Sequence, residues 1–374
     1  MKFNNLVSIL VIGSSLVASQ SMALDVITKS RAVKGYGKRD RVFPVSSETV
    51  SPSQIHEVYG TRVDAGLDVT SSKSTINNDE VTATAPSISA RGVMGGDILA
   101  LGIAAGRSEI AGKADIDVEA KERMIANKFS PTAAITIADH VTLGASSELS
   151  WLEIRQNANG ASEKTLNGYT RREAIGASFH ASKWEIGLMH STAAVSRATS
   201  DEEDNNGLTF GLASFTKSTS DARDLYIPAS NTFFARGNMT PNWSLQGTVS
   251  HANYDKNVDG SKEALNDYRR ADQIASQLQA VYWLDNEATR FAATASYRGA
   301  AHAPYGSDEN TLGYRDANLY GGALDAVFEV TPMTYVGVRL SHLRGERDQD
   351  LADYVRLAAR EERTTLGTTF SKTF

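Results

Sequence analysis

The sequence closes with Thr364–Phe374, TTLGTTFSKTF, in which apolar and small polar side chains alternate. Leu366, Phe370 and Phe374 fall on one face, and the alternate Thr, Gly and Ser residues fall on the other. A period of two residues indicates a β-strand with one apolar face. Lys372 interrupts that face, and we expect its long side chain to carry the amine to a water interface. An edge strand of a soluble protein is the alternative.

The same alternation recurs towards the N-terminus in pairs of segments joined by short turns, such as Leu319–Val330 followed by Val336–Leu340. Gly, Pro, Asn and Asp favour turns for known backbone reasons. The six turns lie at Gly95–Asp97, Asp139–His140, Ser182–Lys183, Thr240–Asn242, Asp285–Asn286 and Thr331–Pro332. Six pairs, with single segments at Val63–Val69 and Leu366–Phe374, make fourteen strands.

Short turns alternate with much longer connections along the whole series. Bacterial outer-membrane barrels have an even strand number, short periplasmic turns and long external loops. A strand of about 9–11 residues crosses the membrane when it is tilted. We therefore predict an all-β fold, a transmembrane antiparallel β-barrel of about 14 strands at 61–374. Trp184, Trp243, Trp283, Tyr282 and Tyr335 lie near the short turns, which predicts an aromatic girdle there.

The N-terminus predicts export and then a plug. Residues 1–23 combine Lys2, an apolar run and the small-residue site Ser21–Ala23, which is the pattern of a secretory signal peptide. Residues 24–60 are long enough to plug a lumen. Within them Ser51–Gln54 forms a capping box, so we expect a short helix over 52–59 that Gly60 ends. A disordered periplasmic leader is the alternative.

Composition excludes several classes of protein. The 374 residues carry 38 Lys and Arg against 44 Asp and Glu, a formal charge of −6, with no basic block, so we expect no nucleic-acid partner. There is no cysteine, which excludes disulfides and thiolate chemistry. Known hydrolase, metalloprotease, nucleotide-binding and dinucleotide-binding motifs are missing, and the histidines stand singly. We expect no enzyme activity, no catalytic residue, no metal and no cofactor.

Strand parity sorts the charged residues of the barrel to its lumen. The acids placed inside are Asp64, Asp68, Glu148, Glu185, Asp325 and Glu329, and the bases are Arg91, Arg172, Arg236, Arg290, Arg298 and Arg339. Mutual ion pairing is the default, because an uncompensated charge in a narrow lumen is costly. The functional alternative is that a guanidinium binds a ligand carboxylate, and the candidates nearest mid-strand are Arg91, Arg236, Arg290 and Arg339.

The longest predicted external loop, Arg197–Tyr226, is unusually apolar for an exposed segment. It contains Leu208, Phe210, Leu212 and Phe215, which are either a structural hairpin or helix or a capture surface for a hydrophobic ligand. Its acidic run, 201–204, is a solvated tip or a cation-mediated contact with lipopolysaccharide. In the last loop Leu351, Tyr354, Val355 and Ala358 follow helical spacing, so we expect a short helix over the barrel mouth.

Several hairpins resemble the outer-membrane long-chain fatty acid and aromatic hydrocarbon transporters of the FadL type. The similar pieces are Leu225–Ser230 with Thr240–Leu245, Phe129–Ala134 with Asp139–Gly144, and Trp184–Leu188. They cover about half of the chain after the signal peptide. The segment 24–60 departs from the family, because it lacks the usual Asn-Pro-Ala hatch motif. The resemblance implies a plugged barrel that passes hydrophobic molecules across the outer membrane.

We therefore expect a monomeric outer-membrane protein of a Gram-negative bacterium that carries fatty-acid-like molecules by passive facilitated diffusion. Its C-terminus is expected in the periplasm, where Phe374 is read by the barrel assembly machinery. The other expected partners are outer-membrane lipid, lipopolysaccharide and a hydrophobic small molecule. The alternatives are a general polar porin and a structural or receptor barrel, such as a phage receptor.

Overall fold

The structure is a computed structural model that describes residues 51–57, 60–76, 79–96, 98–115, 120–137, 140–158, 164–181, 183–199, 222–240, 242–253, 273–284, 289–299, 318–352 and 355–374. The predicted signal peptide, 1–23, and most of the predicted plug, 24–50, lie outside these residues. The four predicted capture residues at 208, 210, 212 and 215 also lie outside them. None of the helices within the described ranges is long and apolar enough to cross a membrane.

The chain folds into one antiparallel barrel preceded by a short 3-10 helix, η1 (Pro52–Glu57). Eight strands have 17 to 19 residues: β1 (Gly60–Ile76), β2 (Asp79–Gly95), β3 (Leu99–Asp115), β4 (Ala120–Ile137), β5 (Val141–Ala158), β6 (Lys164–His180), β15 (Thr334–Ala352) and β16 (Val355–Thr373). The others are shorter: β7 (Trp184–Ser191), β8 (Ala194–Thr199), β9 (Ala222–Ile227), β10 (Ala229–Asn238), β11 (Trp243–Asn253), β12 (Gln273–Trp283), β13 (Thr289–Arg298) and β14 (Leu319–Thr331).

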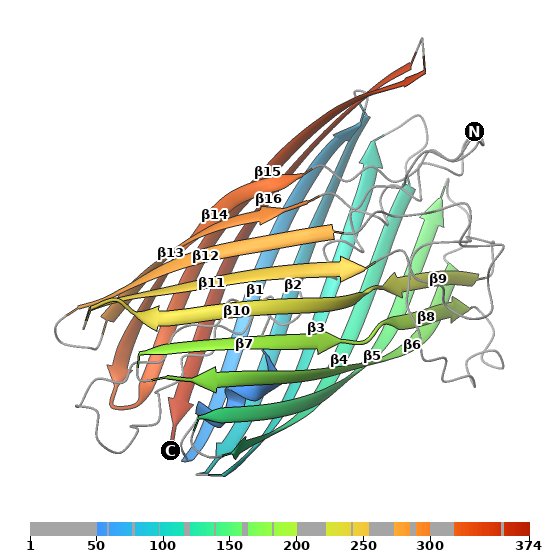
Figure 1. The fold of residues 1–374 in the computed structure, drawn as a ribbon. Coiled ribbons are helices and arrows are strands. Elements are labelled where there is room, and N and C mark those ends of the chain that lie inside the picture. The colour runs from blue at the N-terminus through green and yellow to red at the C-terminus, as the bar shows by residue number, and fades with distance from the viewer. Residues whose placement is uncertain are drawn as a thin grey trace.

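Fourteen of these sixteen strands form a closed ring (Figure 1). Each ring strand pairs with its neighbours, β10 follows β7, and β1 pairs with β16 to close the circle. The remaining two, β8 and β9, pair with each other and continue β7 and β10 after an interruption. The predicted barrel of about 14 strands is therefore confirmed.

The pleat separates an apolar outer face from a mostly polar inner face, because successive side chains point to opposite sides of a strand. Every ring strand contributes a large exposed apolar side chain to the outer face: Leu67, Ile88, Leu101, Ile135, Leu143, Ile175, Leu188, Phe233, Val249, Leu278, Phe291, Leu324, Val338 and Leu366. The alternate residues are buried and are rich in Ser, Thr, Gln, Arg and Asp. This is the arrangement expected of a barrel surrounded by lipid.

Several predicted long loops are strands in the structure. β1 and β2 continue to a two-residue connection at 77–78. The strands of the next two hairpins are also long, so that only residues 116–119 connect β3 to β4 and only residues 159–163 connect β5 to β6. The predicted helix at Leu351–Ala358 is wrong, because β15 runs to Ala352 and pairs it with Val355 at the start of β16. Helical spacing over eight residues did not distinguish a helix from the tip of a hairpin.

The predicted aromatic girdle near the short turns is confirmed in part. Trp184 and Trp243 are exposed on the outer face, where Trp243 packs on Tyr282 with the ring centroids 4.8 Å apart. Trp283 and Tyr335 follow the opposite parity and belong to the inner face, where Tyr335 is buried. Nearness to a turn therefore did not decide which way an aromatic side chain points.

The turn regions show two residues with positive φ. Gly60 has φ 81°, a conformation that glycine adopts without steric cost, and it connects the segment of η1 to β1. Met333 has φ 60° in the tight turn between β14 and β15, where Pro332 precedes it. Proline followed by a residue with positive φ is the pattern of a type II turn, which usually has glycine in the second position.

Candidate lumenal site

Helix η1 lies on the inner wall of the barrel over two glycines that face each other across a strand pair. Gly144 of β5 pairs directly with Gly176 of β6. A Cβ at Gly144 would overlap the backbone of Pro52 and Ser53, and a Cβ at Gly176 would overlap the Ser51 hydroxyl. Without side chains at these positions, the backbone of η1 can rest on the wall.

Ile55 anchors the other end of η1. Its side chain is buried in a cluster with Val93 of β2, Ala100 of β3 and Ala134 of β4. The predicted capping box is formed in part: the Ser51 amide donates to Gln54 Oε1 at 3.2 Å, but Ser51 Oγ accepts from the Ser53 amide at 3.4 Å and not from that of Gln54. The structure thus has a helical turn inside the barrel within the range predicted from the sequence.

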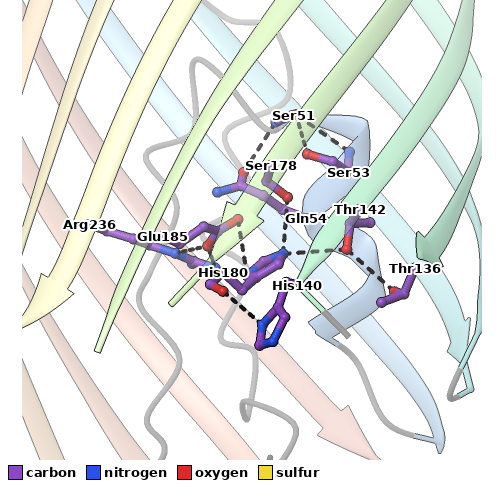
Figure 2. A network of polar contacts seen from close by, with 10 residues as sticks. All are labelled: Ser51, Ser53, Gln54, Thr136, His140, Thr142, Ser178, His180, Glu185 and Arg236. Atoms are coloured by element: carbon purple, nitrogen blue, oxygen red, sulfur yellow. Dashed lines mark hydrogen bonds and ion pairs between the residues drawn. The ribbon is translucent and has the colours of Figure 1, made fainter. Parts of the chain in front are cut away.

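A polar network lies on the wall near η1 (Figure 2). His180 of β6 is its centre: its Nε2 lies 3.3 Å from Thr142 Oγ1 and 3.1 Å from Ser178 Oγ. The His180 backbone carbonyl lies 3.2 Å from Nδ1 of His140. His180 Nδ1 is 4.0 Å from a Glu185 carboxylate oxygen, so the network extends from β5 to β7.

The network ends in a buried ion pair between neighbouring strands (Figure 2). Glu185 of β7 and Arg236 of β10 are cross-strand partners, and the Arg236 guanidinium donates to the Glu185 carboxylate. Their side chains are 6% and 4% exposed. A buried pair of this kind is costly to break, because loss of one partner leaves an uncompensated charge. Arg236, one of the four candidate ligand arginines, is therefore engaged with a carboxylate.

A second charged cluster lies where the barrel closes. Arg62 of β1 donates from Nε to Asp64 Oδ1 at 2.7 Å, and both side chains are 1% exposed. Arg91 of β2 is the direct cross-strand partner of Asp64. Arg62 Nη1 has no hydrogen-bond partner within the part of the chain that the structure describes. Two guanidiniums thus lie beside one carboxylate, which is bound by Arg62, so positive charge is in excess at Arg62 and Arg91.

The remaining two candidate arginines lie on β15 and β13. Arg339 pairs with Asp325 of β14, with Nε 3.6 Å from Oδ1. Asp68 of β1 approaches the same place, since a Cβ at the intervening Gly367 would overlap its carboxylate. Arg290 is buried, and its guanidinium carbon lies 5.4 Å from the centroid of the Trp283 ring. The structure therefore distributes the four candidates around the inner wall and does not gather them into one pocket.

The other acids and bases assigned to the lumen also follow the predicted parity. Glu148 accepts from Lys128 Nζ at 3.1 Å, and Glu329 accepts from the Met333 amide at 2.6 Å. Arg298 is half-buried on the inner parity of β13. Arg172 is also half-buried and has a special position, which is described below.

In the half of β2–β5 that lies away from the short turns, the inner wall is lined mainly by apolar side chains. The buried side chains there are Ala83, Ala85, Ile110, Met124, Ala126, Leu152 and Ile154. Ile110, Met124 and Ile154 stand in one cross-strand row of β3, β4 and β5. β2–β5 thus carry an apolar lining in this half, while the buried Glu361–Arg363 pair of β16 lies at the same level as Ala83, two strands away.

Arg172 of β6 stands at a break in the barrel wall. The strand formed by β7 and β8 is interrupted at 192–193, and the strand formed by β9 and β10 is interrupted at Pro228, which has no amide hydrogen. Arg172 donates to the Thr192 carbonyl at 3.0 Å, to Ser230 Oγ at 3.0 Å and to the Pro228 carbonyl at 3.4 Å. One guanidinium therefore connects three strands where regular pairing stops.

Sequence reasoning missed two features of this site. Arg62 was omitted because the first apolar alternation begins at Val63, one residue after it. The apolar lining was omitted because its strands were taken for loops. A signal for it exists in Leu152–Arg155, where Leu and Ile alternate with Glu and Arg. The period is still two, but the apolar face of that segment points inward.

No protein-family model matches the sequence, and no curated protein matches it either. Solved structures do match. A FadL homologue of Pseudomonas aeruginosa has a TM-score of 0.67 at 11% identity, covering 94% of this chain and 100% of that chain. The toluene transporter TodX of Pseudomonas putida has a TM-score of 0.61 at 12% identity, also covering 94% of this chain and 100% of that chain.

A third structure, the toluene transporter TbuX of Ralstonia pickettii, has a TM-score of 0.58 at 11% identity and covers 87% of this chain and 92% of that chain. The superpositions thus extend over nearly the whole barrel. At such low identity they show a shared fold. The chain resembles FadL-type transporters in its architecture, as the hairpin fragments in its sequence predicted.

Proposed function

We propose that this protein is an outer-membrane channel for hydrophobic small molecules of the fatty-acid-like class, which move through it by passive facilitated diffusion. The observation that carries the proposal is an apolar lining on part of the inner wall. An apolar lining on β2–β5, which includes Ile110, Met124 and Ile154, lies in the half away from the short turns. The charged residues around Asp64 and Glu185 lie nearer the short turns, and the Glu361–Arg363 pair lies beside the apolar lining.

The surroundings of the barrel support this proposal. The continuous outer ring of exposed apolar side chains fits a lipid bilayer. The structural neighbours are named as toluene transporters and as a FadL homologue. On this basis we place the protein in the outer membrane of a Gram-negative bacterium, as a monomer with the short turns and Phe374 on the periplasmic side. Phe374 would then serve the barrel assembly machinery.

The proposed route uses the two kinds of lining in turn. An apolar molecule reaches the external loops, where Leu208, Phe210, Leu212 and Phe215 are the proposed capture residues. It then passes along the apolar lining, and a carboxylate, if present, meets the lumenal arginines. Arg91 is the best placed of these, because its cross-strand partner Asp64 is already bound by Arg62, whereas Arg236 and Arg339 each have a carboxylate of their own.

Residues 24–60 are the proposed plug. Seating of η1 on Gly144 and Gly176 supports this role, because it ties the end of the segment to the inner wall. A barrel of this size encloses more space than its own side chains fill, so removal of residues 25–60 should open it. We expect the shortened protein to give large, steady single-channel conductance in planar bilayers. A conductance equal to that of the full-length mature protein would contradict the plug.

The proposal is tested by displacement of a fluorescent fatty acid from the detergent-purified protein. A long-chain fatty acid should bind more tightly than its methyl ester, by about tenfold or more, because a charge-assisted hydrogen bond contributes about 1.5–3 kcal/mol. Arg91→Gln should narrow this gap more than Arg236→Ala, Arg290→Ala or Arg339→Ala. Phe210→Ser with Phe215→Ser should weaken the capture of acid and ester alike.

Two results would redirect the proposal. Equal affinity for acid and ester would remove the arginine site and favour a neutral hydrocarbon as the substrate. Failure of both to bind would favour a general porin or a structural barrel. A porin would in addition let sugars through, which swelling of liposomes reports.

A further inference from the structure

Three arginines gather on the outer face of the barrel just beyond the apolar ring. Arg107 of β3, Arg123 of β4 and Arg155 of β5 have the outward parity of their strands. On β3 the outward residues Leu99, Leu101 and Ile103 are apolar up to Ala105, and Arg107 is the next one. We call Arg107, Arg123 and Arg155 the outer arginine cluster.

The cluster contains two like charges placed directly opposite each other. Arg123 and Arg155 are cross-strand partners in the β4–β5 register, an arrangement that is destabilising unless other charges offset it. Glu109 accepts two hydrogen bonds from Arg123, at 2.7 and 2.8 Å, and Glu153 pairs with Arg155. The hydrogen bonds from Arg123, and more weakly the positive charge of Arg107, lower the pKa of Glu109. The two carboxylates therefore leave one positive charge in excess.

The guanidiniums remain accessible despite these pairs. The side chains of Arg123 and Arg155 are 45% and 41% exposed, and Arg107 is exposed too. Arg107 makes no ion pair within the described part of the chain. The two carboxylates fix the orientation of two guanidiniums that stay partly exposed. Guanidinium groups held in this way suit a phosphate, which accepts paired hydrogen bonds.

The depth of the cluster fits the level of lipid headgroups. From Leu99 to Arg107 is a span of nine residues, which at about 3.3 Å per residue is enough for a tilted strand to cross the hydrocarbon layer. Trp151 packs on Tyr169 with centroids 5.7 Å apart, and such aromatic pairs mark the membrane interface. Arg155 lies four residues beyond Trp151 on the same strand.

We propose that Arg107, Arg123 and Arg155 bind a phosphate group of an outer-leaflet glycolipid whose acyl chains lie against the apolar face of β3–β5. The proposal rests on the outer-membrane location given under the proposed function. One lipid can contact both surfaces, because the apolar outer face of β3–β5 is continuous with the outer arginine cluster. Basic residues next to an apolar face attract anionic headgroups in the same way at other membrane surfaces.

The opposite side of the barrel offers a matched control. Arg344 of β15 faces Glu362 of β16, and Arg360 of β16 faces Glu346 of β15, so each positive charge meets a negative one. Arg360 Nη2 lies 2.6 Å from Glu346 Oε1. These four residues are exposed and outward-facing like the cluster, and Lys73 of β1 also faces Glu362, so this patch has the same excess of one positive charge. The control therefore separates the position of the arginines from their net charge.

The test is a native mass spectrometry titration of the detergent-purified protein with bisphosphorylated lipid A. We expect Arg107→Gln with Arg123→Gln and Arg155→Gln to weaken binding roughly tenfold or more, since one lost charge-assisted hydrogen bond is worth about that factor. Glu109→Gln with Glu153→Gln should strengthen binding by roughly two- to fivefold, because exposed ion pairs are weak competitors. Arg344→Gln with Arg360→Gln should leave binding unchanged.

Three outcomes would overturn the proposal: equal binding by the triple variant, equal binding of dephosphorylated lipid A, or displacement of the lipid by inorganic phosphate at the same concentration. Heat-modifiable gel migration reports whether each variant is folded. If the triple variant is not folded, Arg107→Gln alone takes its place in the titration. This single change breaks no ion pair within the described residues and should still weaken binding. The titration is independent of fatty-acid binding, so failure of either proposal leaves the other standing.

Discussion

The two sides of the barrel wall are built differently. β1–β6 are uninterrupted strands of 17 or 18 residues, whereas β11–β13 have 10 or 11. Between them the wall is interrupted at 192–193 and at Pro228. About 9–11 residues suffice to cross a membrane. The shorter strands therefore supply the crossing alone, and β1–β6 supply an additional length of wall.

The additional length carries the features that a simple pore does not need. Its inner face is the apolar lining of β2–β5, and its outer face is the outer arginine cluster. The same side also holds the seat of η1 at Gly144 and Gly176. Under the proposed function, the whole ring crosses the membrane and ligand handling is concentrated on β1–β6. The following substitutions test this division.

The largest loss of stability is expected from Glu185→Ala, in the wall of β7 and β10. It leaves Arg236 buried without its carboxylate, which costs about 3–5 kcal/mol. Urea unfolding in detergent measures the free energy of unfolding of the variant and of the unchanged protein. The matched change Glu346→Ala removes the carboxylate of an exposed pair between β15 and β16, whose members are 57% and 61% exposed, and should cost about 0–1 kcal/mol.

A double variant separates the charge from the packing. Glu185→Ala with Arg236→Ala should lose less stability than Glu185→Ala alone, because no buried charge remains unpaired. If the single and double variants were equally destabilised, the ion pair would not be the reason for the loss.

The next effect concerns the seat of η1. Gly144→Val should displace the helix, because the added Cβ meets the backbone of Pro52 and Ser53, and overpacking costs about 1–3 kcal/mol. The chain has no cysteine, so Ser53→Cys provides a single label site. Ser53 is buried, so a cysteine at this position should react with a maleimide only when Gly144→Val is also present.

Gly247→Ala on β11 is the control, since the nearest atoms to its added Cβ lie 4.0 Å away. It should leave the label at position 53 unreactive. Reaction of Ser53→Cys in the parent protein would mean that η1 leaves the wall without any substitution.

A more local effect is expected at the interrupted wall. Arg172→Ala removes the donor that joins Thr192 and Ser230 to β6, which should cost about 1.5–3 kcal/mol locally. Hydrogen exchange at the amides of β8 should become faster. The neighbouring Arg171→Ala, on the exposed outer face, should not change this exchange. Unchanged exchange in Arg172→Ala would show that the break is held by other contacts.

The smallest effect is expected at the turn between β14 and β15. Met333 has φ 60°, a conformation that costs a residue with a Cβ roughly 1–2 kcal/mol. Met333→Gly should therefore raise the free energy of unfolding by up to about 1 kcal/mol, after the entropic cost of glycine in the unfolded chain. A loss of stability would mean that the exposed Met333 side chain contributes more than the strain costs.

The fold was predictable within the membrane, because there the same physical contrast determines the strand structure and the sequence pattern. Lipid outside and a polar lumen inside impose a period of two, so Leu67 was placed outside and Asp64 and Arg236 inside from parity alone. The rule fails beyond the membrane, because lipid no longer selects the outer side chain. Segments such as Ser71–Ile76 then look like loops although they are strands.

The site was less predictable, because pairing depends on neighbours that are distant in sequence. Parity placed Glu185 and Arg236 inside, but only the register of β7 with β10 makes them partners. Likewise Gly144 and Gly176 face each other through the β5–β6 register, and neither glycine by itself indicates a seat for a helix. Register is set by all strands together, which a single segment cannot reveal.

The most direct test of the proposed channel is transport by purified protein in liposomes. The full-length mature protein should speed the entry of a fluorescent long-chain fatty acid and should not cause swelling in isosmotic sugar. Replacing the apolar lining at Ile110 and Ile154 with Asn should slow fatty-acid entry while the barrel stays folded by its heat-modifiable migration. Swelling in sugar, or fatty-acid entry at the rate of protein-free liposomes, would contradict a channel for hydrophobic molecules.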